Sequence, residues 1–458
     1  MEKRKVKNRS KWVRLDNASN IFLAAMSQRD SKVFRISAEV TDTVDPALLQ
    51  QALNKVYDQY LLYHSVLRRG FFWYYLEESD LKPQVQLDTN PSCEPLYHFD
   101  RRELLFRVVY WKKRISIEVF HVLSDGTGAM WFFQDLLTEY LTLLKLDLEI
   151  ETIRTSTYVH ASSSEDSFSR HFRRKEQRNF VEASQSALRN VGQVGAKAKG
   201  LLFPKGTATD TAQKVYQYKG TFTPDNRPRL VEMEMPVTEV LKLAKSANVS
   251  LTLYLTAMFM KSIEKTASNF KGDETMAVSV PVNLRQFFPS TSARNFFAVT
   301  RLEYKYQPDR DNSIAEICAA LKFQFDPQLE SDHLKKWLTS LIYYEYHPIS
   351  RIVLRPIKDF VLKMINHFNN RNLTIAVSNL GRVSFPELVD EWIKQVYFHT
   401  VAVRPQFCAI SHKDIITISF TSPFIETDIF KHYAALLTAE GIPVTVSVNK
   451  VTEEELAH

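Results

Sequence analysis

His121, Asp125 and Gly126 are the residues of this chain whose types and spacing best suit chemistry. They follow an apolar, β-branched run at residues 115–120. A neutral histidine removes a proton from a hydroxyl or an amine near pH 7, because its unperturbed pKa is about 6.5. Asp125 has two open interpretations: it orients the imidazole directly, or it pairs elsewhere and holds the loop in shape. The same pair also occurs in purely structural loops, so a site is a hypothesis at this point.

The segments on either side of this loop must position it. Residues 115–120 have the alternation of a buried strand, which the two glycines after Asp125 bring to an end. The apolar residues that follow recur at spacings of three and four, which predicts a helix with one apolar face: Met130, Phe133, Leu137, Leu141 and Leu144. A second strand and helix, without an equivalent of His121, is expected at residues 415–423 and 426–439. Two similar units with one titratable loop predict a single active site between two lobes.

Periodicity and composition divide the rest of the chain. Further strands are expected at 33–40, 104–110, 229–236, 276–280 and 373–377, and further helices at 45–60, 237–245, 250–266 and 314–325. A polar and basic stretch at 162–211 is expected to connect an N-terminal lobe at 1–161 to a C-terminal lobe at 212–458. The fold class is therefore α+β, with helices and strands mixed in each lobe.

Composition excludes several classes of protein. Hydrophobic residues make up 45% of the 458 residues, enough for packed cores, and no window approaches the ~18 apolar residues of a spanning helix. The charged N-terminus has no apolar segment typical of a secretory signal. Three cysteines are too few and too scattered for a disulfide framework or a zinc site. We expect a cytoplasmic globular protein without a metal.

The net charge of +7 matters mainly through its distribution. Basic residues concentrate in the first dozen positions and between Arg170 and Lys205. Either these are solvated surfaces, or they contact an anionic partner such as a CoA phosphate, an acyl carrier protein or a lipid surface. Nucleic acid is not an expected partner, because no recognition module accompanies the charge.

Several segments together resemble one protein family. Residues 121–126 read His-Val-Leu-Ser-Asp-Gly and fit the His-x-x-x-Asp-Gly signature of the CoA-dependent acyltransferase superfamily. That superfamily includes chloramphenicol acetyltransferase, plant BAHD acyltransferases, polyketide-associated acyltransferases and peptide-synthetase condensation domains. Residues 281–285 with 294–297, and residues 378–383, resemble two later segments of the family. The opening run at 14–73 resembles bacterial alcohol acetyltransferase-like proteins, so the resemblance covers most of the chain.

The resemblance implies two chloramphenicol-acetyltransferase-like lobes with an active-site channel at their interface. It implies that His121 is the general base and that Asp125 is structural, salt-bridged to Arg285 across that interface. Gly126 would permit a close backbone approach. The acyl donor would be an acyl-CoA thioester used as co-substrate, without a permanently bound cofactor, and the acceptor an alcohol or an amine. The oxyanion donor is not identified, and its candidates are Ser378, Asn379, Gly381 and Thr421.

The sequence departs from the signatures of two subgroups of this superfamily. The substrates of those subgroups therefore cannot be assigned to this chain. Phe120 replaces the first histidine of the doubled pair in many condensation domains, and Asn379-Leu380-Gly381 replaces the Asp-Phe-Gly-Trp-Gly signature of BAHD enzymes. Two alternatives therefore stay open, a donor carried on the phosphopantetheine of an acyl carrier protein and a catalytically inactive binding member of the fold. A variant of the acyl-CoA hypothesis places the enzyme on the surface of an anionic membrane. Ordinary structural roles are expected for the other histidines considered: His64, His98, His160 and His399.

Overall fold

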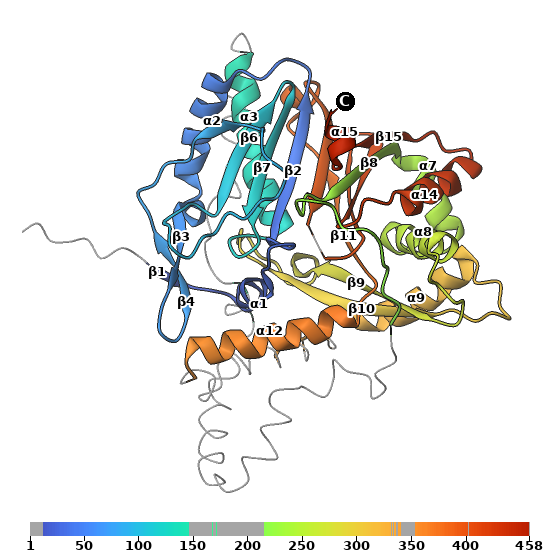
Figure 1. Ribbon diagram of the computed structural model, residues 1–458. Coiled ribbons are helices and arrows are strands. Elements are labelled where there is room, and N and C mark those ends of the chain that lie inside the picture. Colours follow the sequence, from blue (N-terminus) through green and yellow to red (C-terminus); the bar gives the residue numbers. More distant parts are fainter. Residues whose placement is uncertain are drawn as a thin grey trace, which may run out of the picture.

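The computed structural model describes residues 12–145, 167, 171, 215–330, 332, 334–335, 338–339, 353–401 and 403–457. Within this part of the chain the fold is mixed α/β, with two large sheets side by side and one small sheet (Figure 1). The expected connection at 162–211 lies outside the described residues, apart from Ser167 and His171. The described helices include none that is long and apolar enough to cross a membrane.

The first sheet bears the strand that leads to His121. Its five strands follow the order β12 (Ile393–Thr400), β2 (Val33–Val40), β7 (Arg114–Phe120), β6 (Phe106–Trp111) and β5 (Val85–Leu87). Helices α2 (Pro46–Gln59) and α3 (Gly126–Leu144) cover one face of this sheet (Figure 1). The α2 helix begins at Asp45, whose carboxylate accepts from two backbone amides of the first turn, and Pro46 follows at a favourable position.

The two faces of this sheet differ in polarity. On β2, Phe34, Ile36 and Ala38 belong to the hydrophobic cluster under the helices. Successive strand residues point to opposite faces, so Arg35 and Ser37 face the other way. These polar residues continue across the sheet, because Arg35 pairs in register with Glu118 and Ser37 with Ser116. One face is therefore the hydrophobic core of the sheet, and the other carries charged and polar groups.

In the part of the chain that the structure describes, the second sheet contains seven strands. They follow the order β10 (Phe297–Lys305), β9 (Thr275–Asn283), β11 (Ile375–Val383), β13 (Gln406–His412), β14 (Ile415–Ser422), β8 (Arg229–Pro236) and β15 (Thr445–Val448). A second hydrophobic cluster joins it to α7 (Val237–Ser246), α8 (Leu251–Thr266), α9 (Ile314–Gln328) and α14 (Asp428–Ala439). The β14 and α14 pair is the strand and helix expected at 415–439.

The sheets do not follow the chain division expected from the sequence. Residues 212–458 were expected to form one lobe, but β12 from this half pairs with β2 along the edge of the first sheet. The strand contributes Ile393, Val396 and Phe398 to the first hydrophobic cluster. Pairing also covers the β2 edge, whose backbone groups would otherwise lack partners. The C-terminal half thus completes the first sheet as well as forming the second.

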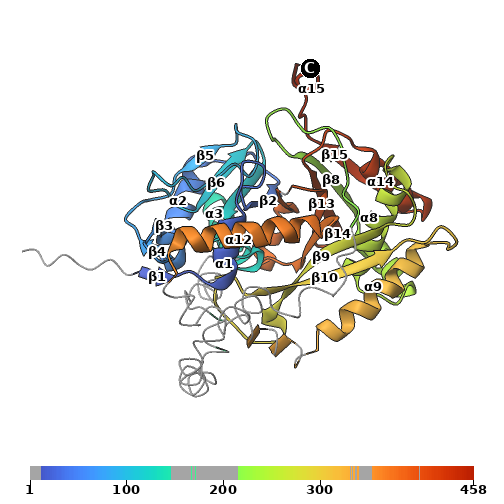
Figure 2. The ribbon, with the colours of Figure 1, turned by 60° about the horizontal axis from the view of Figure 1, so that its bottom comes forward.

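The remaining elements lie around the two large sheets. The small sheet has the order β1 (Trp12–Arg14), β4 (Tyr74–Glu78) and β3 (Ser65–Arg69). Helix α12 (Arg355–Arg371) lies beside α1 (Asn17–Ala25), as both views show (Figure 2). Among the described residues, the short helices are η1 (Leu61–His64), η3 (Leu284–Gln286), α13 (Glu387–Asp390) and α15 (Glu453–Ala457).

Candidate active site

His121 leaves the end of β7 at a point where elements of both large sheets meet. Its backbone amide donates to the carbonyl of Lys32, which fixes the exit from the strand (2.8 Å). The imidazole stacks on Phe22 of α1, with ring centroids 4.0 Å apart. Phe34 approaches edge-on at 5.1 Å, and Phe297 of β10 lies at 5.6 Å. Three aromatic rings therefore restrict the orientation of the imidazole.

Asn295 determines which nitrogen of His121 carries the proton. The Asn295 Nδ2 group donates to the carbonyl of His121 (2.9 Å) and to the hydroxyl of Ser19 (3.1 Å). Both amide hydrogens thus have acceptors, so the Asn295 Oδ1 atom is the group that faces His121 Nδ1 at 3.1 Å. An oxygen acceptor there requires a hydrogen on Nδ1. In the neutral ring, Nε2 is then the nitrogen with the free lone pair.

The surroundings of His121 favour the neutral form of the ring. Burial lowers the pKa of His121 below its usual value of 6.5, and the charge of Asp125 opposes this effect only in part. The side chain keeps partial exposure to solvent, yet the rings packed around it are close enough for desolvation to dominate. A neutral imidazole with Nε2 unprotonated can accept a proton near pH 7.

Asp125 makes its hydrogen bonds to groups other than the imidazole. It is the N-cap residue of α3, where its Oδ1 atom accepts from the backbone amide of Gly128 (2.9 Å). Its Oδ2 atom accepts from Arg285 Nη1 (2.7 Å) and from the amide of Phe296 (2.8 Å). Both oxygens are occupied, and the described partners do not include His121. Of the two interpretations left open by the sequence, this geometry supports the second, in which Asp125 holds the loop in shape.

Arg285 attaches the loop to the second sheet. It lies in η3, directly after β9, and its Nη2 group donates to the carbonyls of Ser292 (2.8 Å) and Arg294 (2.7 Å). The side chains of Arg285 and Asp125 are only 8% and 7% exposed, so the ion pair is buried. Breaking a buried pair leaves an uncompensated charge, which is more costly than the loss of a surface ion pair.

The closest backbone approach in the loop is at Gly128, whereas the sequence had suggested Gly126. A Cβ atom on Gly128 would lie 2.1 Å from the carbonyl oxygen of Ala293 and 2.5 Å from Ser124 Oγ. A Cβ atom on Gly126 would meet the end of the Leu380 side chain at 2.7 Å. A leucine side chain can turn away, but a backbone carbonyl held in a packed interface cannot. The interface therefore requires glycine at 128 more strictly than at 126.

We expect Gly128→Ala to destabilise the protein by more than about 2 kcal/mol, the cost of overpacking a site that cannot relax. The matched variant Gly126→Ala should change stability by less than about 1 kcal/mol, because alanine also favours the helix that begins there. Urea unfolding of both variants and the wild type measures the difference. Equal stabilities for the two variants would show that the Ala293 carbonyl moves freely.

The candidate oxyanion residues at 378–381 lie beside the loop. They belong to β11, and the contact between Leu380 and Gly126 brings the end of this strand to the start of α3. The Asn379 side chain donates to Thr252 Oγ1 (3.0 Å) and accepts from the amide of Gly381 (2.8 Å). Gly381 has a positive φ of 77°, a backbone conformation that favours glycine. This turn places Ser378, Asn379 and Gly381 in one segment bordering the loop.

Thr421 is committed to structural hydrogen bonds. Its hydroxyl donates to the carbonyl of Thr400 (2.8 Å) and accepts from Gln406 Nε2 (2.8 Å). A hydroxyl has one hydrogen, so donation to Thr400 leaves none for an oxyanion. Among the four candidates suggested by the sequence, Thr421 is thus the one that the geometry does not support.

Two contributions to the site were not recognised in the sequence. Segment 294–297 was noted, but the hydrogen bond of Asn295 to the imidazole was not. The aromatic neighbours Phe22 and Phe34 come from an N-terminal helix and an earlier strand, far from His121 in the chain. The only sequence signal for this contact was the asparagine directly before the two phenylalanines. An isolated asparagine does not by itself indicate a partner for a catalytic histidine.

One known protein family matches the part of the chain that forms this site. The model of a family described as alcohol acetyltransferase matches residues 107–409, about two thirds of the 458 residues. No curated protein sequence matches the chain. The matched range includes the loop from His121 to Gly128, Arg285, Asn295 and all of β11.

Solved structures show the same fold at low sequence identity. Trichothecene 15-O-acetyltransferase TRI3 from Fusarium sporotrichioides has 9% identity and a TM-score of 0.58, with 96% of each chain covered. TRI101 of F. sporotrichioides, in complex with coenzyme A and T-2, has 11% identity and a TM-score of 0.54, with 96% of this chain and 100% of that chain covered. The first condensation domain of the calcium-dependent antibiotic synthetase has 12% identity and a TM-score of 0.57, with 94% and 97% covered.

Proposed function

We propose, from the premise that this chain belongs to the alcohol acetyltransferase family and is an acyltransferase, that His121 is its general base. In this proposal an acceptor hydroxyl attacks an acyl-CoA thioester directly, in a ternary complex of enzyme, donor and acceptor. The observation that best supports it is the engagement of His121 Nδ1 by Asn295, since this leaves Nε2 as the nitrogen able to take a proton.

The reaction proceeds in two steps that balance without a covalent enzyme intermediate. In the first, Nε2 of His121 takes the hydroxyl proton as the acceptor oxygen bonds to the thioester carbonyl carbon. In the second, the tetrahedral oxyanion collapses, the carbon–sulfur bond breaks, and the leaving thiolate takes the proton back from the imidazolium. The products are an ester and free CoA. A preorganised donor to the oxyanion would contribute roughly 3 kcal/mol, and the segment at 378–381 is where we place it.

A cysteine nucleophile is the covalent alternative, and the described cysteines do not favour it. Cys93, Cys318 and Cys408 are all buried and free. Burial raises the pKa of Cys408, as it does for the other two thiols, so none is activated as a thiolate. A Cys408→Ala variant that retains acyl transfer would agree with direct attack.

Acyl-CoA is the donor we propose, because the family transfers acetyl groups and the similar TRI101 structure contains coenzyme A. The test incubates the protein with acetyl-CoA and longer acyl-CoAs, together with a panel of alcohols and amines. Release of free thiol that depends on the acceptor, with the ester identified by mass spectrometry, supports the proposal. No turnover with any donor would favour the inactive binding member instead. A strong preference for the same acyl group on a carrier protein would favour the alternative donor.

The pH dependence of kcat/KM provides a second test of the base. A general base must be neutral, so activity should be lost as the pH falls through the pKa of His121. Because burial lowers that pKa, the acidic limb should lie below pH 6.5, the ordinary value for histidine. Asn295→Asp would place a carboxylate beside Nδ1, stabilise the imidazolium and move the limb to higher pH. If the acidic limb of Asn295→Asp stayed at the wild-type pH, Asn295 would have no influence on the proton transfer.

A further inference from the structure

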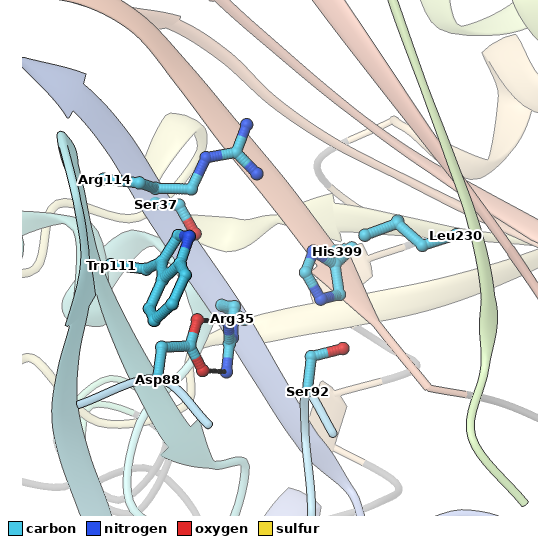
Figure 3. A pocket seen from close by; sticks show the side chains of 8 residues that line it. All are labelled: Arg35, Ser37, Asp88, Ser92, Trp111, Arg114, Leu230 and His399. Carbon is cyan, nitrogen blue, oxygen red and sulfur yellow. Dashed lines mark hydrogen bonds and ion pairs between the residues drawn. The ribbon is translucent and has the colours of Figure 1, made fainter. Parts of the chain in front are cut away.

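A cavity of about 380 Å³, away from His121, opens on the polar face of the first sheet. Figure 3 shows the residues that line it: Arg35, Ser37, Asp88, Ser92, Trp111, Arg114, Leu230 and His399. The described residues that contact His121 are not among them, and Arg35 points to the opposite face from Phe34, which touches His121. Its volume lies within the range of roughly 300–1,000 Å³ typical of small-molecule sites.

His399 is the unusual member of this lining. It is 2% exposed, and in the described part of the chain neither ring nitrogen has a hydrogen-bond partner. Burial and the charges of Arg35 and Arg114 lower the pKa of His399 well below its usual value, so the ring is neutral. A neutral imidazole offers one donor and one acceptor. Buried polar atoms are normally satisfied, and a hydroxyl in the cavity would satisfy a nitrogen of this enclosed ring once the imidazole turns toward it.

The arginines of the cavity already have acidic partners. Arg35 donates to both oxygens of Asp88 (2.6 and 3.0 Å) and to Glu118 (2.7 Å). Arg114 pairs with Glu232 of β8 (3.1 Å). Glu118 also pairs with Arg107, so three arginines face three carboxylates and the cavity has no excess positive charge to attract an anion. Its polar groups instead suit a ligand that both donates and accepts hydrogen bonds.

Trp111 adds a flat apolar surface to these polar groups. The residue is 49% exposed, although it belongs to the cavity lining, so part of it remains open to solvent. Figure 3 shows the indole above the Asp88 and Arg35 pair, with His399 on the other side of the opening. An aromatic face beside a carboxylate, a guanidinium and an imidazole matches a molecule with an apolar C–H face and a rim of hydroxyls.

We infer that this cavity binds a neutral polyhydroxylated ligand, a saccharide or a cyclic polyol, with its hydroxyls on His399 and Asp88 and its C–H face on Trp111. Because Leu230 comes from the second sheet, such a ligand would contact both large sheets. The inference does not depend on the proposed reaction at His121.

The test measures binding of glucose, methyl glucoside and myo-inositol by saturation-transfer NMR and thermal shift, with glucose 6-phosphate as the anionic probe. The neutral compounds should bind and raise the melting temperature, and the phosphate should bind no more tightly. Trp111→Ala and His399→Leu should each weaken binding about tenfold, since each removes one contact of this kind. Trp12→Ala, at another exposed tryptophan, should have no effect.

The stability of the His399→Leu variant without ligand tests whether the imidazole lacks a hydrogen-bond partner in the free protein. Replacing an unsatisfied buried polar group by an apolar one should leave the free protein at least as stable as the wild type. Mass spectrometry after incubation with acetyl-CoA distinguishes an acylated acceptor from a ligand that does not react. Absence of binding by all three neutral compounds, tighter binding of glucose 6-phosphate, or full affinity in both variants would overturn the inference.

Discussion

His121→Ala is expected to lower the rate of acyl transfer by ~10²–10⁴-fold, the usual contribution of a positioned general base. The loss should appear in kcat, because the alanine leaves the donor and acceptor sites in place but removes the group that takes the hydroxyl proton. Thiol release from acyl-CoA in the presence of the preferred alcohol measures the rate. The residual rate should no longer show the acidic limb of the wild type, since the group that titrates there is gone.

Two controls separate chemistry from folding in this variant. Circular dichroism and the melting temperature should stay close to those of the wild type, because the surrounding rings of Phe22, Phe34 and Phe297 remain. His98→Ala is the matched variant, since His98 is partly exposed and pairs only with Glu103 among its described partners. It should transfer acyl groups at the wild-type rate. Wild-type activity in a folded His121→Ala protein would remove His121 from the mechanism.

Arg285→Ala is expected to have the largest effect on stability, a loss of about 3–5 kcal/mol, as when one partner of a buried ion pair is removed. The change leaves the carboxylate of Asp125 buried and without its cation. It also leaves the carbonyls of Ser292 and Arg294 without the guanidinium donor. Because Asp125 caps α3, the loop that bears His121 should become less ordered, and activity should fall with stability. Urea unfolding and the acyl-transfer assay measure the two effects.

Two comparison variants show whether burial of the ion pair is the reason for the large loss of stability in Arg285→Ala. Lys82→Ala breaks an exposed ion pair with Asp58, whose side chains are 60% and 59% exposed, and should cost less than about 1 kcal/mol. Arg285→Lys keeps the charge but lacks the planar fork that reaches Asp125 and two carbonyls, so it should restore only part of the stability. If Arg285→Ala kept both the wild-type stability and activity, the ion pair would have no structural role.

Local periodicity was sufficient to predict the elements around the loop. The alternation at 115–120 and the helical spacing from Met130 correspond to β7 and α3, because both patterns reflect which side chains of one short segment face the core. The strand and helix at 415–439 and the helix begun by Asp45 were predicted for the same reason. Family resemblance supplied the pairing of Asp125 with Arg285, which periodicity alone does not indicate.

Residues that meet only in three dimensions were not predictable in this way. Asn295 contacts His121 across 174 positions of sequence, and Phe22 reaches the ring from a separate helix. Whether Gly126 or Gly128 needed to be glycine depended on where Ala293 and Leu380 came to lie. The position of β12 in the first sheet was missed, because a strand pattern does not specify which edge it joins.

By itself, the sequence determined the strand, loop and helix that contain His121, and with the family resemblance it determined the class of reaction. Only the tertiary structure decided which nitrogen of the imidazole is available to take a proton, and that Asp125 serves the helix and Arg285 rather than the imidazole. It also placed His399 beside a cavity, with no hydrogen-bond partner among the described residues. The physical reason is that periodicity records the burial of each segment, whereas hydrogen-bond partners depend on distances between segments that packing alone establishes.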